Sequence, residues 1–341
     1  MKKYIITGVE GNKQIATSKA REDISFFLKD LEFSDLKIKI PKSKLKKALF
    51  SKSELLTELN KVEEEAILIF QYPLYSHFLE DAFLSKIKNK NKIKKILLLH
   101  DVESLRFYKD NRVEIDREIN FFNHFDIIIS HNTKMSMWLK SVGVMKPLID
   151  LELFDYSEKT ENVLSKKEDP IIFAGNLIKS KFLTKLKIDT PLKLYGINPN
   201  ELEYATNISY EGAYEASKLG EHIIGGFGLV WDGDSIETCT GVTGEYMRFN
   251  NPHKISLYLA KGLPIIIWKE SALSSFVVEN GLGFLVDDLS SIDRILSSMT
   301  ESDYEKMQTN VLKFSQKIRH GAFIKKAINE SLRIILEEQE L

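Results

Sequence analysis

The stretch MRFNNPHKISLYLAKGLPIIIW, residues 247–268, places a polar cluster directly before an apolar helix and an apolar strand. Pro252 suits the first turn of a helix, because the N–H that proline lacks would have no partner there. The backbone amides near His253 and Lys254 then face the positive end of the helix dipole, where an anion is stabilised. The Lys254 charge adds to that attraction, so this stretch predicts a diphosphate site at a helix N-terminus.

Polar residues just before the helix add candidate contacts for hydroxyl groups. Phe249 precedes Asn250 and Asn251, whose side-chain amides are suited to the hydroxyls of a ribose or a sugar. A simpler interpretation stays open, in which the helix is merely capped and Lys254 is solvated.

The rest of the chain alternates short apolar runs with helical patterns, which is typical of a parallel sheet covered by helices on both faces. In the first half the predicted strands are 4–6, 66–70, 95–99 and 126–129, and the predicted helices are 20–31, 52–62, 75–89, 111–122 and 133–142. In the second half the predicted strands are 170–174, 192–195, 208–210, 227–231, 264–268 and 283–286, with helices at 253–261, 272–280, 290–300, 301–317 and 320–338.

A charged, irregular stretch at 155–169 separates the two series and is the best candidate for a linker. We therefore expect two α/β domains, at 1–154 and 155–319, with the C-terminal helix 320–341 joining the first. A length of 341 residues agrees with two domains.

Net charge, apolar run lengths and cysteine content exclude several classes of protein. The formal net charge of -1 argues against nucleic-acid binding over the whole surface. The N-terminal apolar run is too short for a signal sequence, and no stretch reaches the length of a membrane span. The single cysteine, Cys239, excludes an internal disulfide and suits a reducing compartment, so we expect a cytoplasmic protein.

Two lysine-rich stretches, at 41–53 and 86–95, have two interpretations. They could meet an acidic partner or a membrane face, which allows at most peripheral membrane contact. Solvated surface is the simpler interpretation.

Residues that follow predicted strands deserve attention, because open parallel sheets bind ligands at the carboxyl ends of their strands. The first strand is followed by Thr7–Asn12, a glycine-containing turn, with Thr17 close behind it. This turn does not match the Gly-x-Gly-x-x-Gly dinucleotide fingerprint, and no Walker A lysine motif appears.

A second strand end carries the sequence HDVESLR, residues 100–106. His100, Asp101, Glu103 and Arg106 provide candidates for a general base, its orienting partner and a cation for an oxygen ligand. Asp101 could instead cap the next helix and pair with Arg106. His131 follows the next strand, and we expect both histidines near the same sheet edge.

A third strand end, FAGNLIKSKF at 173–182, combines small residues with Asn176, Lys179 and Lys181. Small residues let a ligand approach the backbone, and the ammonium groups suit phosphate oxygens, with Lys181 the preferred contact. At a fourth strand end, Asp232 and Asp234 form an Asp-x-Asp pair, the arrangement by which many single-domain sugar transferases hold a divalent cation. We keep metal binding as the lesser alternative and expect no metal.

Together the segments HDVESLR, AGNLIKSKF, GFGLVWDGDSIETCTG and YMRFNNPHKISLYLAKGLPIIIW make the chain similar to a known family. It resembles the bacterial sugar transferases that add glucose to N-acetylglucosamine on serine-rich-repeat adhesins, together with related galactofuranosyltransferases. The resemblance runs in order over nearly the whole chain. It implies the GT-B fold, two Rossmann-like α/β domains facing across a cleft, with the donor held mainly by the second domain.

The resemblance also implies a UDP-sugar donor, UDP-glucose first, no required metal, and a homo-oligomer for which a tetramer is one candidate. The implied UDP site comprises Thr17, the turn Asn176 to Lys181, Tyr210 to Gly212, and Phe249 to Lys254. The acceptor is then a glycosylated serine-rich protein that approaches the first domain.

We therefore predict transfer of a hexose, with Lys254 stabilising the leaving diphosphate and Asp101 or Glu103 acting on the acceptor hydroxyl. Three alternatives stay open: a galactofuranosyltransferase of surface polysaccharide synthesis, a non-catalytic sugar-nucleotide or glycan-binding scaffold, and an epimerase or synthase acting on a nucleotide sugar. The sequence leaves open whether the anomeric configuration is retained or inverted.

Overall fold

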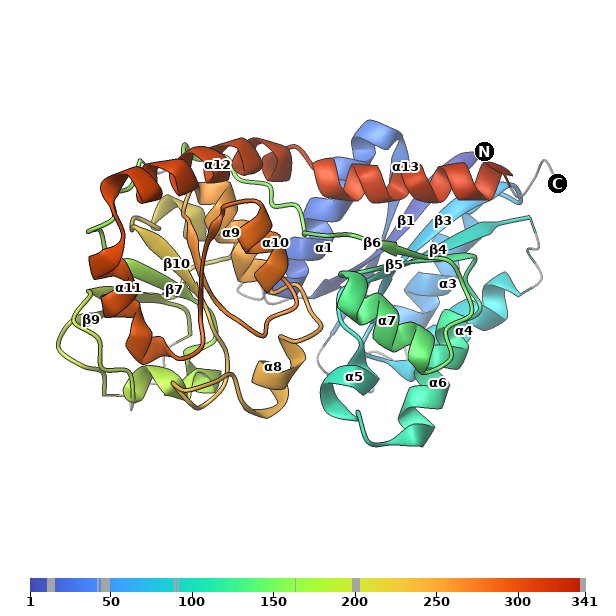
Figure 1. Ribbon diagram of the computed structural model, residues 1–341. Helices are drawn as coiled ribbons and strands as arrows, with labels where there is room; N and C mark the ends of the chain where they lie inside the picture. The colour runs from blue at the N-terminus through green and yellow to red at the C-terminus, as the bar shows by residue number, and fades with distance from the viewer. Residues whose placement is uncertain are drawn as a thin grey trace. The chain divides into compact units, whose positions relative to one another are not determined.

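The computed structural model describes residues 1–10, 16–41, 43, 50–88, 90, 92–162, 164–197 and 203–337. The chain divides into two compact units, and the C-terminal segment Gly321–Leu341 belongs with Met1–Glu152. The second unit is Leu153–His320, so the stretch 155–169, considered above as a linker, is part of it. Figure 1 shows the two series of strands in different colours, blue to green for the first unit and yellow to orange for most of the second.

The described strands of the first unit form one parallel sheet in the order β2-β1-β3-β4-β5-β6. Its inner strands are continuous apolar runs, because helices cover both faces of the sheet; in β3 every residue is buried. The strands are β1 (Lys2–Glu10), β2 (Phe33–Ile40), β3 (Ala66–Tyr72), β4 (Lys94–Leu99), β5 (Ile127–Ser130) and β6 (Leu148–Asp150).

The helices of this unit divide between the two faces of the sheet. Because parallel crossovers are right-handed, the connection from β1 to β2 and those that run from β2 towards β6 lie on opposite faces. Accordingly α13 packs against α1 on one face, and α3 packs against α4 on the other (Figure 1). The helices are α1 (Ala16–Phe27), η1 (Leu28–Leu31), α3 (Lys52–Asn60), α4 (His77–Ile87), α5 (Glu103–Phe107), α6 (Arg112–Phe122), α7 (Thr133–Ser141) and α13 (Ala322–Glu337).

All four strands predicted in the first half are confirmed, but two strands escaped prediction. The edge strand β2 has an alternating burial pattern, so its apolar residues never form a continuous run. The strand β6 is only three residues long. The predicted turn at Thr7–Asn12 is wrong over its first part, because β1 continues to Glu10 and pairs there with Ile40 of β2.

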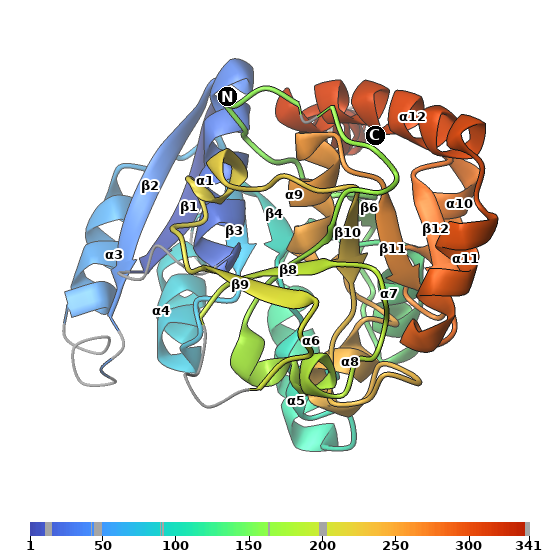
Figure 2. The ribbon, with the colours of Figure 1, turned by 90° about the vertical axis from the view of Figure 1, so that its left-hand side faces the viewer.

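The described strands of the second unit form another parallel sheet, in the order β12-β11-β10-β7-β8-β9. Figure 2 shows β8 and β9 towards the viewer, with β12 farther along the same sheet. All six predicted strands are confirmed as β7 (Ile171–Ala174), β8 (Leu192–Tyr195), β9 (Ile208–Gly212), β10 (Phe227–Val230), β11 (Ile265–Trp268) and β12 (Gly283–Val286).

The helices of the second unit include one that was not predicted. The stretch between β10 and α9 contains the short helix α8, although its sequence has no clear period. Within the described ranges, no helix is long and apolar enough to cross a membrane. The helices are η3 (Leu177–Lys179), η4 (Lys181–Thr184), η5 (Leu219–Glu221), α8 (Gly241–Tyr246), α9 (His253–Lys261), α10 (Ser274–Glu279), η6 (Leu289–Ser291), α11 (Ile292–Ser298) and α12 (Glu301–Arg319).

Helix α9 is fixed to the sheet by one tyrosine. A Cβ atom on Gly228 of β10 would lie 2.2 Å from the Tyr258 ring, so only glycine allows this approach. The Tyr258 hydroxyl accepts a hydrogen bond from the Ala174 amide at 2.7 Å and donates to the Leu229 carbonyl at 3.4 Å. Tyr258 therefore joins α9 to the ends of β7 and β10.

Candidate nucleotide-sugar site

The sheet of the second unit reverses its strand order at β7. From β7 the chain builds β8 and β9 on one side and β10, β11 and β12 on the other. Such a reversal leaves a crevice at the carboxyl ends of the two central strands, where open α/β sheets bind their ligands. In this unit the reversal falls between β7 and β10, which are neighbours in Figure 1, so a ligand is expected at the carboxyl ends of these two strands.

Lys254 occupies this position. Its ammonium group lies 4.5 Å from the centre of the Phe173 ring of β7, donates to the Trp231 carbonyl after β10 at 3.0 Å, and pairs with Asp232 at 3.3 Å. The Lys254 side chain is only 12% exposed. An ammonium group has three N–H donors, and the Trp231 carbonyl and the Asp232 carboxylate take up two of them. The third is suited to an oxygen of a phosphate group.

Helix α9 has the predicted bounds, but Pro252 lies just before its first turn instead of within it. Pro252 is the N-cap residue, with extended backbone angles of φ −60° and ψ 125°, and the helix begins at His253. Pro252 provides no side-chain hydrogen bond to the first turn, whereas its carbonyl accepts from the Ile255 amide at 3.0 Å. The first amides of a helix have no intrahelical acceptor, so those of His253 and Lys254 supply the partial positive charge.

The residues before the helix fold back in a turn after α8. The amides of Phe249 and Asn250 both donate to the Tyr246 carbonyl, at 2.9 and 3.0 Å. The side-chain oxygen of Asn250 is buried and accepts no hydrogen bond from any described residue, which is uncommon outside functional sites. Asn251 is buried.

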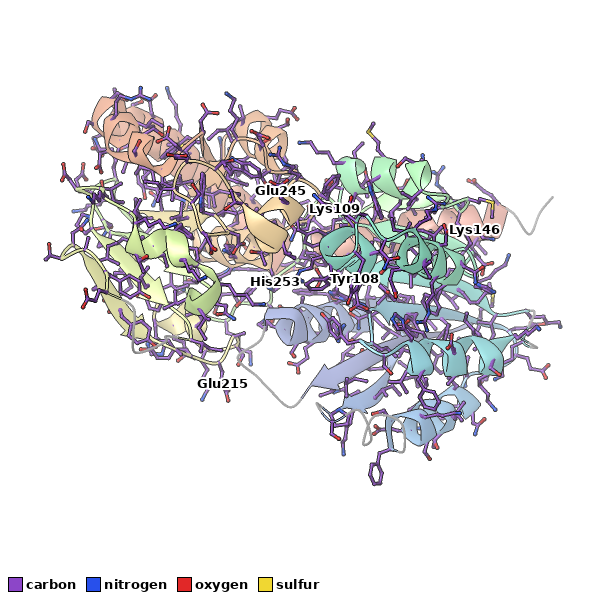
Figure 3. The ribbon with its side chains drawn as sticks, turned by 90° about the horizontal axis from the view of Figure 1, so that it is seen from below. Tyr108, Lys109, Lys146, Glu215, Glu245 and His253 are labelled. Carbon is purple, nitrogen blue, oxygen red and sulfur yellow. The ribbon has the colours of Figure 1, made fainter. Side chains whose placement is uncertain are left out.

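The imidazole of His253 lies between two aromatic rings. Its ring centre is 5.2 Å from that of Tyr156 and 5.9 Å from that of Phe154, and all three residues belong to the second unit. Figure 3 labels His253 at the beginning of α9 and Glu245 in the neighbouring α8.

The predicted lysine-containing turn follows β7. Asn176 caps η3 by accepting a hydrogen bond from the Ile178 amide at 3.1 Å. Lys179 and Lys181 are both exposed, and the Lys181 ammonium lies 3.8 Å from the Asp234 carboxylate, so this exposed pair contributes little to stability. Both lysines keep the freedom to move towards a bound anion.

The ends of β8 and β9 approach the end of β7 through glycine. Gly196 has a φ of +143°, and a Cβ atom on it would lie 1.7 Å from the Gly175 carbonyl, which no other residue type could accommodate. The Gly196 amide donates to the Gly212 carbonyl at 2.9 Å, and the Tyr210 hydroxyl donates to the Gly196 carbonyl at 3.0 Å. The predicted residues Tyr210 and Gly212 therefore lie at the same sheet edge as Gly175.

The two carboxylates of the Asp-x-Asp pair have different partners. Asp232 pairs with Lys254, and Asp234 pairs with Lys181. No group of three or more metal-binding side chains occurs among the residues that the structure describes.

In the first unit, the predicted polar residues follow β4. The His100 ring nitrogen Nε2 lies 2.8 Å from the side-chain oxygen of Gln71 in β3, and both residues are buried. Asp101 forms an ion pair with Arg106 at 3.0 Å and accepts a hydrogen bond from Tyr75 at 3.4 Å. Asp101 does not cap α5, because the N-cap residue is Val102.

Burial shifts the pKa of Glu103 and the pKa of His131 in opposite directions. Burial, together with the nearby Glu80 and Glu118 carboxylates, raises the pKa of Glu103 to about 7. Burial lowers the pKa of His131 to about 3, so His131 is neutral near pH 7. As expected, His131 follows the strand next to β4, and its side chain is buried at 1% exposure.

Thr17 lies in the first turn of α1. Its side chain and residues 11–15 of the preceding turn are outside the part of the chain that the structure describes, so the predicted donor contact there stays a prediction.

The comparison with family models matches both units. The N-terminal domain of the glucosyltransferase 3-like family matches residues 2–153, and the C-terminal domain of the same family matches residues 171–331. The chain belongs to the glucosyltransferase 3-like family.

Individual relatives cover most or nearly all of the chain. It is 31% identical over 334 residues to the β-1,6-galactofuranosyltransferase WbbI of Escherichia coli (strain K12), covering 96% of this chain and 97% of the relative. It is 29% identical to glucosyltransferase 3 of Streptococcus parasanguinis, covering 78% of each chain. The glucosyltransferase 3-like protein described here is therefore a glycosyltransferase.

Solved structures of low sequence identity show the fold. The sucrose-phosphate synthase of Thermosynechococcus elongatus superposes with a TM-score of 0.66 at 11% identity, covering 99% of this chain and 100% of that one. An alpha-glucosyltransferase in complex with UDP superposes with a TM-score of 0.59 at 14% identity, covering 98% and 100%. The predicted GT-B fold is confirmed.

Sequence reasoning missed several residues that build these sites. Phe173 and Tyr258 appeared only as apolar positions, although an aromatic residue at a strand end beside a small residue could have marked a cation site. Asp232 was considered only as a metal ligand, and its role as the Lys254 partner has no local signal. Glu118 lies in a helix far from every strand-end motif.

Proposed function

We propose that this glycosyltransferase moves a hexosyl group from a UDP-sugar to a sugar hydroxyl. Glucose is the first donor sugar to consider, and N-acetylglucosamine on a serine-rich-repeat adhesin glycoprotein is the first acceptor, as in the family that the sequence resembles. The cytoplasmic location, the homo-oligomer and the absence of a required metal stay part of this proposal.

One observation carries the proposal: Lys254 stands at the strand-order reversal, on the first turn of α9, with one donor left for an additional oxygen. Cleavage of the bond between the sugar and the diphosphate builds negative charge on UDP. A fixed ammonium group and helix amides stabilise that charge more in the transition state than in the ground state, which lowers the barrier.

The other proposed donor contacts surround Lys254. Asn250 and Asn251 offer side-chain amides to sugar or ribose hydroxyls. The turn Asn176 to Lys181 contacts the diphosphate. Tyr210 to Gly212, in β9, complete the proposed set. The low polarity around Phe173 and Trp231 strengthens each of these electrostatic contacts. The Asp232 carboxylate pairs with the Lys254 ammonium before the donor arrives.

In the first unit, the acceptor hydroxyl is assigned to Asp101 and Glu103, with His100, Arg106 and His131 as supporting groups. A carboxyl group with a pKa near 7 changes its protonation at neutral pH, as a proton acceptor in catalysis must. Asp101 is held by Arg106 and is better suited to orienting than to accepting a proton.

A second donor has specific support. The galactofuranosyltransferase relative is matched over 96% of this chain, whereas the streptococcal glucosyltransferase relative is matched over 78%. Transfer of galactofuranose into a surface polysaccharide is therefore the alternative to be tested beside glucose.

The experiment compares UDP-glucose and UDP-galactofuranose, with GDP- and dTDP-sugars as controls. Binding is measured by the shift in melting temperature, and transfer by mass spectrometry of N-acetylglucosamine-bearing glycopeptides and galactose-terminated oligosaccharides. We expect only uridine nucleotides to stabilise the protein, and one acceptor to gain a hexose in the presence of EDTA. Binding without transfer to any acceptor would favour a scaffold, loss of transfer in EDTA would favour a metal-dependent reaction, and conversion of the donor without an acceptor would favour an epimerase or synthase.

A further inference from the structure

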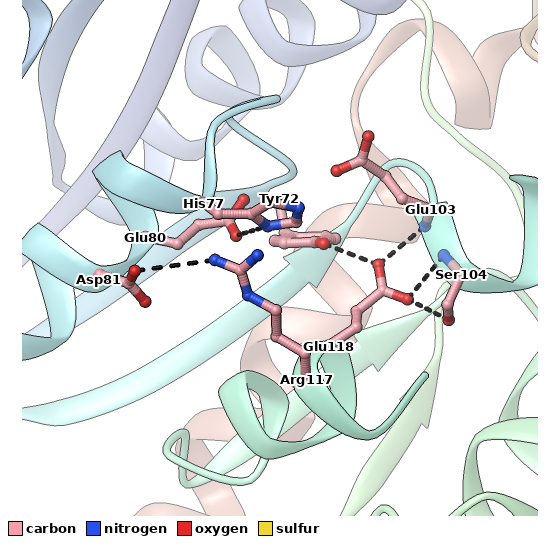
Figure 4. A network of polar contacts seen from close by, with 8 residues as sticks. All are labelled: Tyr72, His77, Glu80, Asp81, Glu103, Ser104, Arg117 and Glu118. Atoms are coloured by element: carbon pink, nitrogen blue, oxygen red, sulfur yellow. Dashed lines mark hydrogen bonds and ion pairs between the residues drawn. The ribbon is translucent and has the colours of Figure 1, made fainter. Parts of the chain in front are cut away.

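The carboxylate of Glu118, in the middle of α6, is the centre of a buried network in the first unit. It accepts hydrogen bonds from the Tyr72 hydroxyl at 2.7 Å, the Glu103 amide at 2.8 Å and the Ser104 amide at 2.9 Å, and a further bond from the Ser104 hydroxyl. Figure 4 shows these four contacts converging on its two oxygens. One side chain thus connects the end of β3, the start of α5 and α6.

The start of α5 depends on this distant carboxylate. The first amides of a helix need an acceptor, which the N-cap residue usually provides, but Val102 at this N-cap has no polar side chain. Glu118, which lies in α6, replaces the N-cap side chain by accepting hydrogen bonds from the first two amides of α5. Hydrogen bonds to a charged acceptor are stronger than neutral ones, so they fix the first turn of α5 firmly.

A buried carboxylate is a costly way to cap a short helix. Glu118 is only 7% exposed, and burial raises its pKa, while the hydrogen bonds from Ser104, Tyr72 and Glu103 oppose that rise. A neutral side chain would satisfy the same amides at lower cost in desolvation. We therefore expect the negative charge of Glu118 to affect the ionisation of a neighbouring residue.

The neighbour is Glu103, whose backbone is held by Glu118. A second buried carboxylate, Glu80 of α4, is 4% exposed and helps to raise the pKa of Glu103. One Glu80 oxygen pairs with His77 at 3.2 Å, and the other is buried with no hydrogen bond from the described residues. The side chain of Glu103 is the one member of the three that is partly open to solvent.

Other charged groups around Glu103 act less strongly. His77 of α4 opposes the effect of the carboxylates, and Asp101 just before α5 adds to it. Arg117 of α6 lies near His77 and forms an ion pair with Asp81 at 3.7 Å (Figure 4).

We propose that Glu118 is a positioning residue of the acceptor site, which fixes the first turn of α5 so that Asp101 and Glu103 are held in place for the acceptor hydroxyl. This inference rests on the proposed function, because that proposal assigns the acceptor to Asp101 and Glu103. Glu118 does not itself touch the substrate.

The carboxylates near Glu103 predict how the transfer rate depends on pH. The negative charges of Glu118 and Glu80 oppose ionisation of Glu103, which helps to raise its pKa to about 7. If ionised Glu103 is the active form, transfer rises with pH through that value. Removing the charge of Glu118 lowers the pKa of Glu103, so the acidic limb of the profile moves to lower pH.

The test compares Glu118→Gln with Tyr72→Phe. The glutamine removes the charge and cannot accept all four hydrogen bonds, whereas the phenylalanine removes one bond and leaves the charge. For Glu118→Gln we expect kcat/KM for the acceptor to fall on the order of tenfold to a hundredfold, because small displacements of reacting groups are costly. The acidic limb should move to lower pH, and UDP binding and slow hydrolysis of the donor should persist. Tyr72→Phe should give a smaller loss with the limb in place.

A separate measurement keeps the two proposals apart. Titration of the Glu103 carboxyl by ¹³C NMR, assigned with Glu103→Gln, reports the effect of Glu118 without any enzymatic activity. Absence of UDP binding in the wild-type protein would overturn the proposed function. An unchanged Glu103 pKa or an unchanged acidic limb in Glu118→Gln would overturn the inference on Glu118. If that variant does not fold, Ser104→Ala, which removes one bond to Glu118, should still raise the acceptor KM without changing UDP affinity, and an unchanged KM would overturn the inference.

Discussion

Replacing Lys254 by methionine removes the ammonium group at the centre of the proposed donor site and keeps a side chain of similar length. The ammonium lies 3.0 Å from the Trp231 carbonyl and 3.3 Å from the Asp232 carboxylate, and Asp232 is 24% exposed. Loss of the partner leaves a mostly buried carboxylate uncompensated, which should cost about 1–3 kcal/mol of unfolding free energy. The effect on transfer should be larger. Loss of one fixed electrostatic group typically lowers kcat about 10²–10³-fold, or about 3–4 kcal/mol in the barrier.

Two further variants separate stability from chemistry. Asp232→Asn keeps the ammonium and should retain most of the transfer rate. The double variant Lys254→Met with Asp232→Asn removes the unpaired carboxylate, so its unfolding free energy should return towards that of the wild-type protein while transfer stays low. Lys261→Met is the matched control, because Lys261 is a buried lysine at the other end of α9 that bonds to Thr160 and the Glu161 carbonyl.

The assay is single-turnover transfer from the donor to its acceptor, with urea unfolding of the same preparations. We expect Lys261→Met to lose stability and to transfer at nearly the wild-type rate. The reasoning is refuted if Lys254→Met transfers within about threefold of wild type, a loss far below that of an electrostatic catalyst. It is also refuted if the double variant recovers transfer together with stability.

Three other predictions follow from the described contacts. Gly228→Ala should displace α9, because the new Cβ would lie 2.2 Å from the Tyr258 ring; calorimetry should show a loss of about 1–3 kcal/mol, with weaker UDP binding. In Glu103→Gln, the gain in unfolding free energy over wild type should grow as pH rises from about 4.5 to about 7, since the raised pKa makes ionised Glu103 unfavourable in the folded state; an equal gain at both ends of that range in urea titrations would contradict the pKa shift. His131→Asn should reduce the loss of stability on acidification below about pH 6.5, because neutral His131 takes up a proton only on unfolding until the pH nears about 3; identical acid unfolding of both proteins would rule this out.

Much of the fold was accessible from the sequence. The inner strands of both sheets are continuous apolar runs between helical patterns, and each of those predicted was found. The sequence failed where a strand is exposed on one face, as in β2, and where a helix is too short to show a period, as in α5 and α8. The helix predicted at 253–261 was found with the same bounds as α9, and only Pro252, expected in its first turn, lies just before the helix as its N-cap residue.

The candidate sites were only partly accessible. The end of a predicted strand indicated His100 and Asp101, and the start of a predicted helix indicated Lys254, because both signals lie in neighbouring residues. The pair of Asp101 with Arg106 was also accessible, because the two residues are close in the chain. Asp232 and Glu118 gave no such signal, since the 22 positions between Lys254 and Asp232 and the 15 between Glu103 and Glu118 are bridged only by folding. The roles assigned to these residues stay predictions until the variants above are measured.

The sequence by itself determined that this protein is built of parallel α/β units and that a cationic helix start precedes an apolar strand, because apolar periodicity and helix signals are properties of neighbouring residues. Only the tertiary structure decided that Lys254 lies over Phe173 beside Asp232, and that Glu118 holds the start of α5. The physical reason is the order of the strands. This order brings together the ends of segments that are far apart in the chain. Charged side chains at these ends interact only after the sheet has formed, because electrostatic energies depend on distance.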